Sequence, residues 1–543
     1  MNKLILVTSV LLAAVFGVAY FYFSNISAGS KNNDKALAHI PQDAALIFEF
    51  KNDKGFYEIF ADYPIFDALV GSTRKTELTA LKNVLLNNKL IQKIASDQNI
   101  FLSLHPSQSN EIDFLWLMAS SKKITDEELE SAISPDKNLS YNRLPLNETS
   151  ILKLHISGLN RPFYLHNHQG IIAASFSKEL LLQTLHKNLP KIQEGFIAEI
   201  NAASMKNENS PANLFINFKS SVPFLQPFFK HKLNGIFSLL HNLEGFSTLN
   251  MNFKSDALMF NGITKTDTFK AAYLNLFLHQ QPIKNTIKRL VPDNTSNFVS
   301  FGVSDYPRFH QDLKQWLAKR NELAKLNASM ETMAKETGIN PDRDIKKLWR
   351  NEFIIFQLST QEKLGAIRLT NGTQLQFFLE PLSTEHSENI RHFEYPDLLY
   401  NYFGDPFRQF SKPYFTIIDN QLIVSNSPGT LQRFLQAYNQ EKLLYKTPNY
   451  STFEQLVADQ SNVSFFIHLK NSGSNITTFL KPDYARPFKS EEYGLKDFYG
   501  ISYQWSSSGT HFLSNFYAAY KLAPVSESDF TNTSPSSDSR LVQ

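Results

Sequence analysis

Two histidines lie close enough in the sequence to bind one metal ion together. His166 and His168 are two residues apart in a segment that we expect to be a strand, so their side chains would point to the same face of a sheet. No third ligand is near them in the sequence, and a similar segment later in the chain has Ile417 and Asp419 at the matching positions. Polar residues beside a turn explain the pair more simply, so we predict no metal site here.

A second group of residue types that can bind metals occurs in one short polar segment. It consists of Glu385, His386, Glu388, His392 and Glu394. Such residues are common in solvated loops, and their presence alone does not define a coordination geometry. We therefore assign no metal and no cofactor to the chain.

Acid–base catalysis would require at least two titratable groups that converge in a cleft. His392 with Glu394, and Asp344, are the first candidates for a hydrolase. Asp344, however, follows Pro341 at an expected helix start, where free backbone N–H groups and the helix dipole favour aspartate without catalysis. The chain also lacks a phosphate-binding loop, a dinucleotide-binding fingerprint, a nucleophile elbow and an HExxH motif. The sequence therefore assigns no catalytic residue.

The composition narrows the remaining classes of function. The chain has no cysteine, which excludes disulfides, thiolate metal sites and a cysteine nucleophile. Its 54 Lys and Arg residues are nearly balanced by 51 Asp and Glu residues, so we predict no nucleic-acid partner. Apolar residues make up 42% of the 543 residues, which is enough for a sizeable hydrophobic core.

An aromatic segment, residues 222–243, could line a site for an apolar ligand. It reads VPFLQPFFKHKLNGIFSLLHNL. Covering a hydrophobic core is the more ordinary role for such a segment. If it lines a cavity instead, Phe224, Phe228, Phe229 and Phe237 are the residues expected to contact a lipid or another apolar molecule.

One segment of the chain, which contains His166 and His168, occurs twice in similar form. Residues 161–185, RPFYLHNHQGIIAASFSKELLLQTL, resemble residues 412–435, KPYFTIIDNQLIVSNSPGTLQRFL. In each copy a proline opens an aromatic strand, a polar turn follows at 168–170 or 419–421, and an apolar strand leads into leucines spaced as in a helix. This pattern predicts a β-hairpin followed by a helix.

Several other elements can be predicted from local patterns. Ser177 and Ser427 precede the leucine-spaced segments and are expected helix N-caps, because a serine hydroxyl can accept a bond from a free N–H of the first turn. Thr125 is an expected cap of the short helix that follows it. Residues 307–336 have helical spacing of apolar residues, and residues 374–379 are expected to form a strand.

The resemblance between the two halves extends beyond the hairpin. Three pairs of similar residues are separated by 251 positions: Pro41 and Pro292, Pro162 and Pro413, and Phe215 and Phe466. A fourth match, GFSTLNMNF from Gly245 with FYGISYQW from Phe498, is shifted by a residue or two. Four matches in the same order at nearly one spacing predict a tandem duplication.

The amino-terminal segment, residues 1–23, has the pattern of a membrane anchor. Lys3 is followed by an uncharged run from Leu4 to Phe23, and a helix of this length covers about 30 Å, the thickness of a bilayer core. A cleaved signal peptide is the alternative, but its apolar region is normally shorter. With Lys3 on the inner side, the bulk of the chain would lie outside the cytoplasmic membrane.

The remaining boundaries follow from composition and from the repeat. Residues 24–37 are polar and are expected to form a linker. Residues 38–280 and 281–521 are the two expected repeats. Residues 522–543, rich in Ser, Thr and Asp, are an expected disordered tail.

These features together resemble one group of known proteins. An amino-terminal anchor, the first strand IPQDAALIFEF, and FYLHNHQGIIAASFSKELLLQTL with its repeat are similar to bacterial membrane-anchored envelope proteins that carry a duplicated domain of unknown function. The resemblance implies an anchored, exported α+β protein. It supplies no catalytic residues to transfer.

The expected fold class is α+β, with two tandem-duplicated lobes and one N-terminal transmembrane helix. Each lobe is expected to be an antiparallel sheet with helices on one face. The expected function is a non-enzymatic binding or scaffolding role in the cell envelope, with the membrane and an envelope protein as partners. An exposed aromatic patch from residues 395–410 would support that role. A carrier of a lipid or other apolar ligand and a hydrolase are the alternatives.

Overall fold

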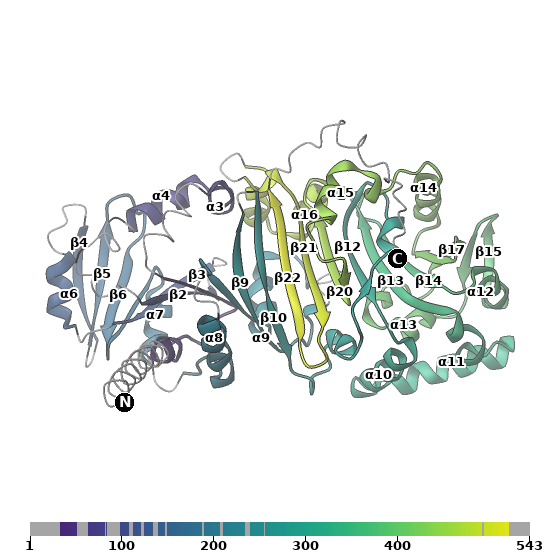
Figure 1. The fold of residues 1–543 in the computed structure, drawn as a ribbon, viewed down its shortest axis with the longest axis horizontal. Helices are drawn as coiled ribbons and strands as arrows, with labels where there is room; N and C mark the ends of the chain where they lie inside the picture. Colours follow the sequence, from purple (N-terminus) through teal and green to yellow (C-terminus); the bar gives the residue numbers. More distant parts are fainter. Residues whose placement is uncertain are drawn as a thin grey trace, which may run out of the picture. The chain divides into compact units, whose positions relative to one another are not determined.

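The chain forms two compact units in the computed structural model (Figure 1). The described residues are 33–51, 63–81, 83, 89, 98–107, 112–120, 124–133, 139–146, 149–186, 189–206, 210–233, 239–254, 256–490 and 494–520. The first unit contains the described residues up to 254 together with Phe260–Ala272 and Phe479–Gly494. The second contains Asp256–Met259, Tyr273–Thr478 and the residues from Leu495 onward.

The first unit is built on one sheet. Its strands are β1 (Leu46–Lys51), β2 (Asn99–Pro106), β3 (Ile112–Ala119), β4 (Leu139–Leu146), β5 (Thr149–Ile156), β6 (Phe163–His168), β7 (Ile171–Ser175), β8 (Asn213–Asn217), β9 (Gly245–Lys254) and β10 (Ala257–Thr266). Their order in the sheet is β4-β5-β6-β7-β3-β2-β1-β8-β9-β10. The pairings from β4 to β9 are all antiparallel.

Helices cover both faces of this sheet. The described α-helices of this unit include α3 (Pro64–Val70), α4 (Ser72–Leu81), α6 (Asp126–Ile133), α7 (Lys178–Leu185), α8 (Glu194–Lys206), α9 (Phe218–Leu225) and α17 (Pro482–Ala485). Successive residues of β7 point to opposite faces: Ala173 packs in one core cluster with Leu181 of α7, and Ala174 packs in another with Leu129 of α6. The prediction of helices on one face only is therefore wrong for this unit.

Local chemistry explains several element boundaries in the first unit. Thr125 and Glu128 form a reciprocal capping box at the start of α6, with N–H to side-chain oxygen distances of 3.2 and 3.0 Å. The β6–β7 turn consists of Gln169 and Gly170, both with positive φ, which suits a two-residue hairpin turn. Ser177 accepts a hydrogen bond from the Leu180 N–H, so it caps α7 as predicted.

The second unit is also built on one antiparallel sheet. Its strands are β12 (Thr295–Gly302), β13 (Trp349–Leu358), β14 (Lys363–Leu369), β15 (Ser383–Ser387), β16 (Ile390–Phe393), β17 (Tyr414–Ile418), β18 (Gln421–Ser425), β20 (Val463–His468), β21 (Phe498–Ser507) and β22 (Phe512–Tyr520). Their order is β15-β16-β17-β18-β14-β13-β12-β20-β21-β22. A separate small sheet pairs β11 (Ile283–Lys284) with β19 (Gln460–Ser461).

The two sheets have the same strand order when β1 is matched with β12. The register agrees as well, because Ile47 pairs with Phe215 and Phe298 pairs with Phe466, 251 positions further along. In the hairpins the spacing is 250, since the second turn consists of Asp419 and Asn420. The predicted turn limits, and the match of the two hairpin prolines at 251, are therefore wrong by one residue.

Helices again lie on both faces of the second sheet. They are α10 (Tyr306–Lys319), α11 (Leu323–Thr337), α12 (Gly372–Leu379), α13 (Leu398–Phe403), α14 (Pro428–Asn439), α15 (Pro448–Glu454) and α16 (Gly473–Phe479). Phe356 of β13 packs against Phe434 of α14, with ring centroids 6.1 Å apart. Phe353 of the same strand packs against Phe309 of α10 and Phe403 of α13, at 6.0 and 5.0 Å.

Three predictions in the second unit can be judged directly. The helical region predicted at 307–336 is confirmed as α10 and α11, separated by a short break. The strand predicted at 374–379 is wrong, because Asn371 accepts a bond from the Gln374 N–H and caps α12 there. Ser427 is the N-cap residue of α14 as predicted, but its side chain makes no capping hydrogen bond.

The predicted exposed aromatic patch is also wrong. Residues 395–410 contain α13 and a 3₁₀ turn, and their large apolar side chains are buried. Phe403, for example, is fully buried and lies 5.3 Å from Trp349 between ring centroids. These aromatic residues cover one face of the sheet, which is where the burial of their area stabilises the fold most.

The ends of the chain bear on the predicted anchor and boundaries. The predicted anchor, residues 1–23, and the predicted tail, residues 522–543, lie outside the described residues. Among the described residues, no helix is both long enough and apolar enough to span a membrane. Residues 33–37, at the end of the predicted linker, are helical, and Ala36 and Leu37 are fully buried in the core of the first unit.

Candidate functional site

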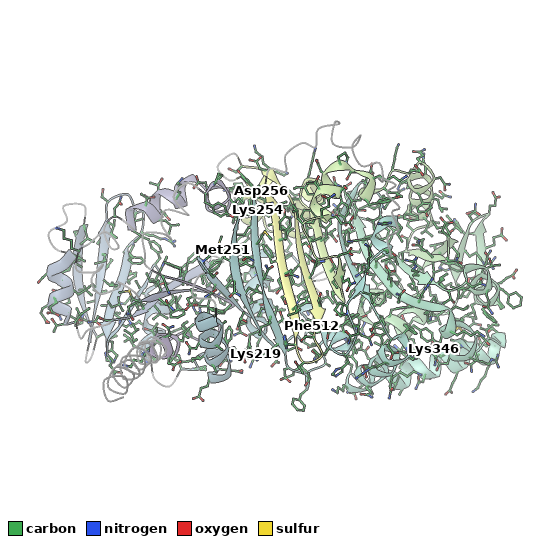
Figure 2. The ribbon with its side chains drawn as sticks, in the orientation of Figure 1. Lys219, Met251, Lys254, Asp256, Lys346 and Phe512 are labelled. Atoms are coloured by element: carbon green, nitrogen blue, oxygen red, sulfur yellow. The ribbon has the colours of Figure 1, made fainter. Side chains whose placement is uncertain are left out.

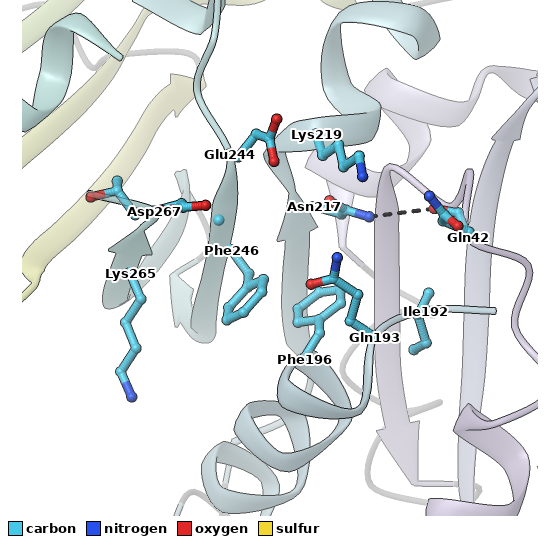
Figure 3. A pocket seen from close by; sticks show the side chains of 12 residues that line it. Gln42, Ile192, Gln193, Phe196, Asn217, Lys219, Glu244, Phe246, Lys265 and Asp267 are labelled. Atoms are coloured by element: carbon cyan, nitrogen blue, oxygen red, sulfur yellow. Dashed lines mark hydrogen bonds between the residues drawn. The ribbon is translucent and has the colours of Figure 1, made fainter. Parts of the chain in front are cut away.

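A cleft in the first unit is the candidate site. It has a volume of about 280 Å³ and lies where β8 ends, α8 and α9 begin and β9 and β10 meet their loops (Figure 3). Its lining residues are Gln42, Ile192, Gln193, Phe196, Asn217, Lys219, Glu244, Gly245, Phe246, Lys265, Thr266 and Asp267. The volume is at the lower end of the range typical of small-molecule sites, about 300–1,000 Å³.

Hydrogen bonds fix one wall of the cleft. Asn217, the last residue of β8, donates from its side-chain amide to the Gln42 carbonyl at 3.5 Å and to the Ser220 hydroxyl at 3.1 Å (Figure 3). The Ser220 hydroxyl donates in turn to the Gln42 carbonyl at 3.1 Å. The start of α9 is thereby tied to the loop before β1, so this wall is preformed.

An aromatic pair forms the apolar part of the lining. Phe196 of α8 and Phe246 of β9 are stacked, with ring centroids 4.8 Å apart and planes at 16°. Phe196 is almost fully buried, whereas Phe246 is partly exposed. The partly exposed ring offers a flat apolar surface next to amide groups.

The acidic and basic side chains on one side of the cleft are mostly paired with each other. Lys265 lies 2.5 Å from Glu199, and Lys270, on the loop after β10, lies 3.0 Å from Glu244. Asp267 accepts a hydrogen bond from the backbone of its own loop at 2.9 Å. These groups leave little uncompensated charge on that side.

Lys219 differs from these paired groups. It is exposed at the start of α9, and no ion pair involving it occurs among the described residues (Figure 2). Figure 3 shows its side chain and that of Gln193 pointing into the same space from opposite sides. The cleft therefore combines one available cation, amide groups and an aromatic surface.

The aromatic residues predicted to contact an apolar ligand lie elsewhere. Phe224 is buried and contacts Phe228, with ring centroids 5.5 Å apart, and Phe228 contacts Tyr484 at 4.6 Å. Phe229 is partly buried beside them, and Phe237 lies outside the described residues. None of the three described residues lines the cleft, so the role of the four as a ligand site stays a prediction.

The predicted hydrolase candidates occupy two separate local structures. His392 Nδ1 lies 3.7 Å from a Glu394 oxygen on the outside of the β15–β16 hairpin. Asp344 accepts two bonds from Arg343 at 2.8 Å and one from the Asn340 N–H at 2.9 Å. Arg343 holds the pKa of Asp344 below its usual range, which is opposite to the shift that a general base near neutral pH needs.

The two histidines of the first hairpin, His166 and His168, differ in burial. His166 is buried, and its Nε2 lies 2.8 Å from the Thr184 hydroxyl of α7. Burial lowers the pKa of His166 to about 3, so the ring is neutral at physiological pH. Among the described residues, no group of three or more His, Asp or Glu side chains could hold a metal ion.

A serine, a histidine and an aspartate form a hydrogen-bonded chain that the sequence analysis did not find. The Ser103 hydroxyl lies 2.8 Å from His105 Nε2, and His105 Nδ1 lies 2.7 Å from an Asp43 carboxylate oxygen. This is the order of groups in serine hydrolases. The only signal in the sequence is that Ser103 and His105 are two residues apart on one strand and share a face.

The surroundings of Ser103 favour a structural role for this chain of groups. Ser103 is fully buried, and only Asp43 is substantially exposed, at 47% of its side chain. β2 lies between β1 and β3, and Ser103 pairs with a residue on each side. An oxyanion hole requires free donors, whereas backbone groups here belong to the two ladders.

Comparison with protein-family models, with curated proteins and with solved structures finds no match to this chain. The candidate site therefore stands on its own geometry. Sequence reasoning missed it because its residues are ordinary polar types from distant segments.

Proposed function

We propose that this protein is a non-enzymatic binding component of the cell envelope and that the cleft of the first unit is its recognition site. The observation that carries this proposal is the preformed wall made by Asn217, Ser220 and Gln42 beside an available lysine. A wall already fixed by hydrogen bonds loses little conformational entropy when a ligand binds. Anchoring by residues 1–23, with the bulk of the chain outside the cytoplasmic membrane, is part of the proposal.

We also infer that the two units arose by tandem duplication. Their common strand order and the shared pairing of Phe215 with Ile47 and of Phe466 with Phe298 support this origin. After a duplication one copy can keep the fold while the other acquires a site. That history would explain why the side chains at the matching place in the second unit differ from those that line the cleft of the first unit.

Photo-crosslinking tests the proposed function. A benzophenone amino acid at position 193 of the full-length chain should yield a discrete adduct in cells that naturally contain the protein. The matched control is position 445 in the second unit. The residue before position 193, Ile192, donates its N–H to the Ile40 carbonyl, and the residue before position 445, Leu444, donates its N–H to the Val291 carbonyl in the same way. Equal adducts at both positions, or none at 193, would contradict the proposal.

A hydrolase is the second candidate, because Ser103, His105 and Asp43 have the order and spacing of a triad. An activity-based fluorophosphonate probe decides between the two candidates. Since Ser103 is fully buried, we expect no labelling of the folded chain. Labelling that disappears in the Ser103→Ala variant would establish the hydrolase instead.

The carrier of a lipid or other apolar ligand stays a proposal of the sequence. It rests on the aromatic composition of residues 222–243. Native mass spectrometry of the chain, purified without detergent, tests it. An extra mass of lipid size that is lost in a Phe228→Ser variant would favour the carrier over the polar cleft.

A further inference from the structure

We propose that the cleft binds a carboxylate carried on an amide-containing group, as in an N-acyl amino acid or the carboxyl-terminal residue of a peptide. This inference rests on the proposed function and names the ligand class of the same site. Its parts are Lys219, the amide side chains of Gln193 and Asn217, and the Phe246 ring.

The charges of the cleft select a single negative charge. Lys219 is the lining cation for which the described residues supply no ion pair, so it is free to meet an anion. Glu244 and Lys265 line the same cleft but are paired with Lys270 and Glu199, so Lys219 is the lining cation left to meet a ligand. A carboxylate matches this single positive charge, whereas a phosphate dianion brings one charge more than Lys219 can compensate.

The uncharged lining suits the rest of such a ligand. Gln193 is exposed and its amide carries both donors and an acceptor, the pattern that a peptide group requires. Phe246 is partly exposed and is held in place by its stack with Phe196, so it offers a fixed apolar surface to a side chain. The Asn217 amide is held in place by its bonds to Ser220 and Gln42.

The size of the cleft limits how much of the ligand it holds. A volume of about 280 Å³ is close to the lower limit for small-molecule sites, so it suits one residue rather than a long peptide or a lipid chain. The cleft is therefore expected to bind the carboxyl-terminal residue of a chain. The free α-carboxylate then distinguishes a chain end from the middle of a chain.

Isothermal titration calorimetry on the full-length chain tests this inference. The probes are N-acetylphenylalanine and its neutral analogue N-acetylphenylalaninamide. The acid should bind about fivefold more tightly than the amide, the upper range for one exposed charge pair. Lys219→Gln should remove this difference between the acid and the amide.

The second unit supplies the matched control. Lys470 lies 251 positions after Lys219, is also exposed and also follows the end of the matching strand, so Lys470→Gln should change neither affinity. Thermal unfolding of both variants checks that they are folded. Equal affinity for acid and amide, or an equal effect of the two lysine variants, would overturn the inference.

Two further arms identify the source of the carboxylate. A tripeptide ending in phenylalanine that binds as tightly as N-acetylphenylalanine indicates recognition of a chain end, and a tripeptide that does not bind indicates a small free acid. A crosslink at position 193 without binding of any probe would contradict the proposed ligand class and support the proposed function. Binding of the probes without a crosslink would support the ligand class and contradict the proposed function.

Discussion

The ends of β8 and β20 are matching places in the two units that have a similar backbone arrangement but different side chains. In the first unit the Ser220 hydroxyl donates to the Gln42 carbonyl at 3.1 Å, and in the second the Asn471 amide donates to the Asp293 carbonyl at 2.8 Å. These residues occupy matching positions, 251 apart. The connection between the strand end and the preceding loop is therefore made in both units, although the residue types differ.

The side chains at the strand ends differ in chemistry. Asn217 makes hydrogen bonds at the wall of an open cleft, whereas His468 is 7% exposed and its ring lies 4.6 Å from that of Tyr499. The Asn471 N–H donates to His468 Nδ1 at 3.1 Å. Burial lowers the pKa of His468 to about 4. The bonds to the preceding loop therefore set the backbone frame, and the side chains on it decide whether the place is an open cleft or part of the core.

The matched core phenylalanines give the largest expected effect. Phe215 and Phe466 are 0% and 2% exposed, and they lie on the strands that pair with β1 and with its counterpart β12. Phe215→Ala and Phe466→Ala should each lower the free energy of unfolding by about 3–5 kcal/mol. Urea unfolding of the full-length chain measures both. A cost below about 1 kcal/mol at one position would show that the two sites are not equivalent in packing.

The second prediction concerns the pH dependence contributed by His468. Its folded pKa of about 4 lies below the unfolded value of 6.5, so its contribution to stability is present above pH 6.5 and is lost as the pH falls toward 4. A lowering of the pKa from 6.5 to about 4 corresponds to roughly 3 kcal/mol across that window. His468→Asn, which introduces the residue of the first unit, should remove this part of the pH dependence.

Urea unfolding of the parent chain and of the variant between pH 4 and pH 7 measures the difference. Asn217→Gln is the matched control, because it changes the same position of the first unit without a titratable group. Its stability profile should run parallel to that of the parent. Parallel profiles for His468→Asn as well would mean that His468 does not titrate as its burial requires.

Local patterns predicted much of this fold because they are written in neighbouring residues. The hairpins, the capping box at Thr125 and the helices around Leu313 depend on contacts within a few positions. Residues 374–379 misled the prediction because the first four of them, QLQF, alternate between polar and apolar as in a strand, whereas the decisive bond comes from Asn371 outside the segment. The pattern within a short segment does not show whether a residue before the segment caps it as a helix.

Contacts between distant segments explain what the sequence could not predict. The cleft joins Gln42, Gln193 and Asn217, which come from three separate parts of the chain. Each is an ordinary polar residue by itself. The burial of residues 395–410 has a similar cause, because nothing in that segment indicates that the opposite face of the sheet needs a cover.

The helices that follow the two hairpins give the smallest expected effect and the most closely matched pair. The Leu180 N–H donates to the Ser177 hydroxyl at 3.3 Å, whereas the side chain of Ser427 accepts no such bond and Pro428 stands at the first helical position. Proline removes one of the free N–H groups that a cap would otherwise satisfy. Ser177→Ala should therefore cost about 1 kcal/mol of unfolding free energy, and Ser427→Ala should cost close to nothing. Thermal unfolding of the two variants side by side measures this difference, and equal losses would mean that the cap is not what distinguishes the two helix starts.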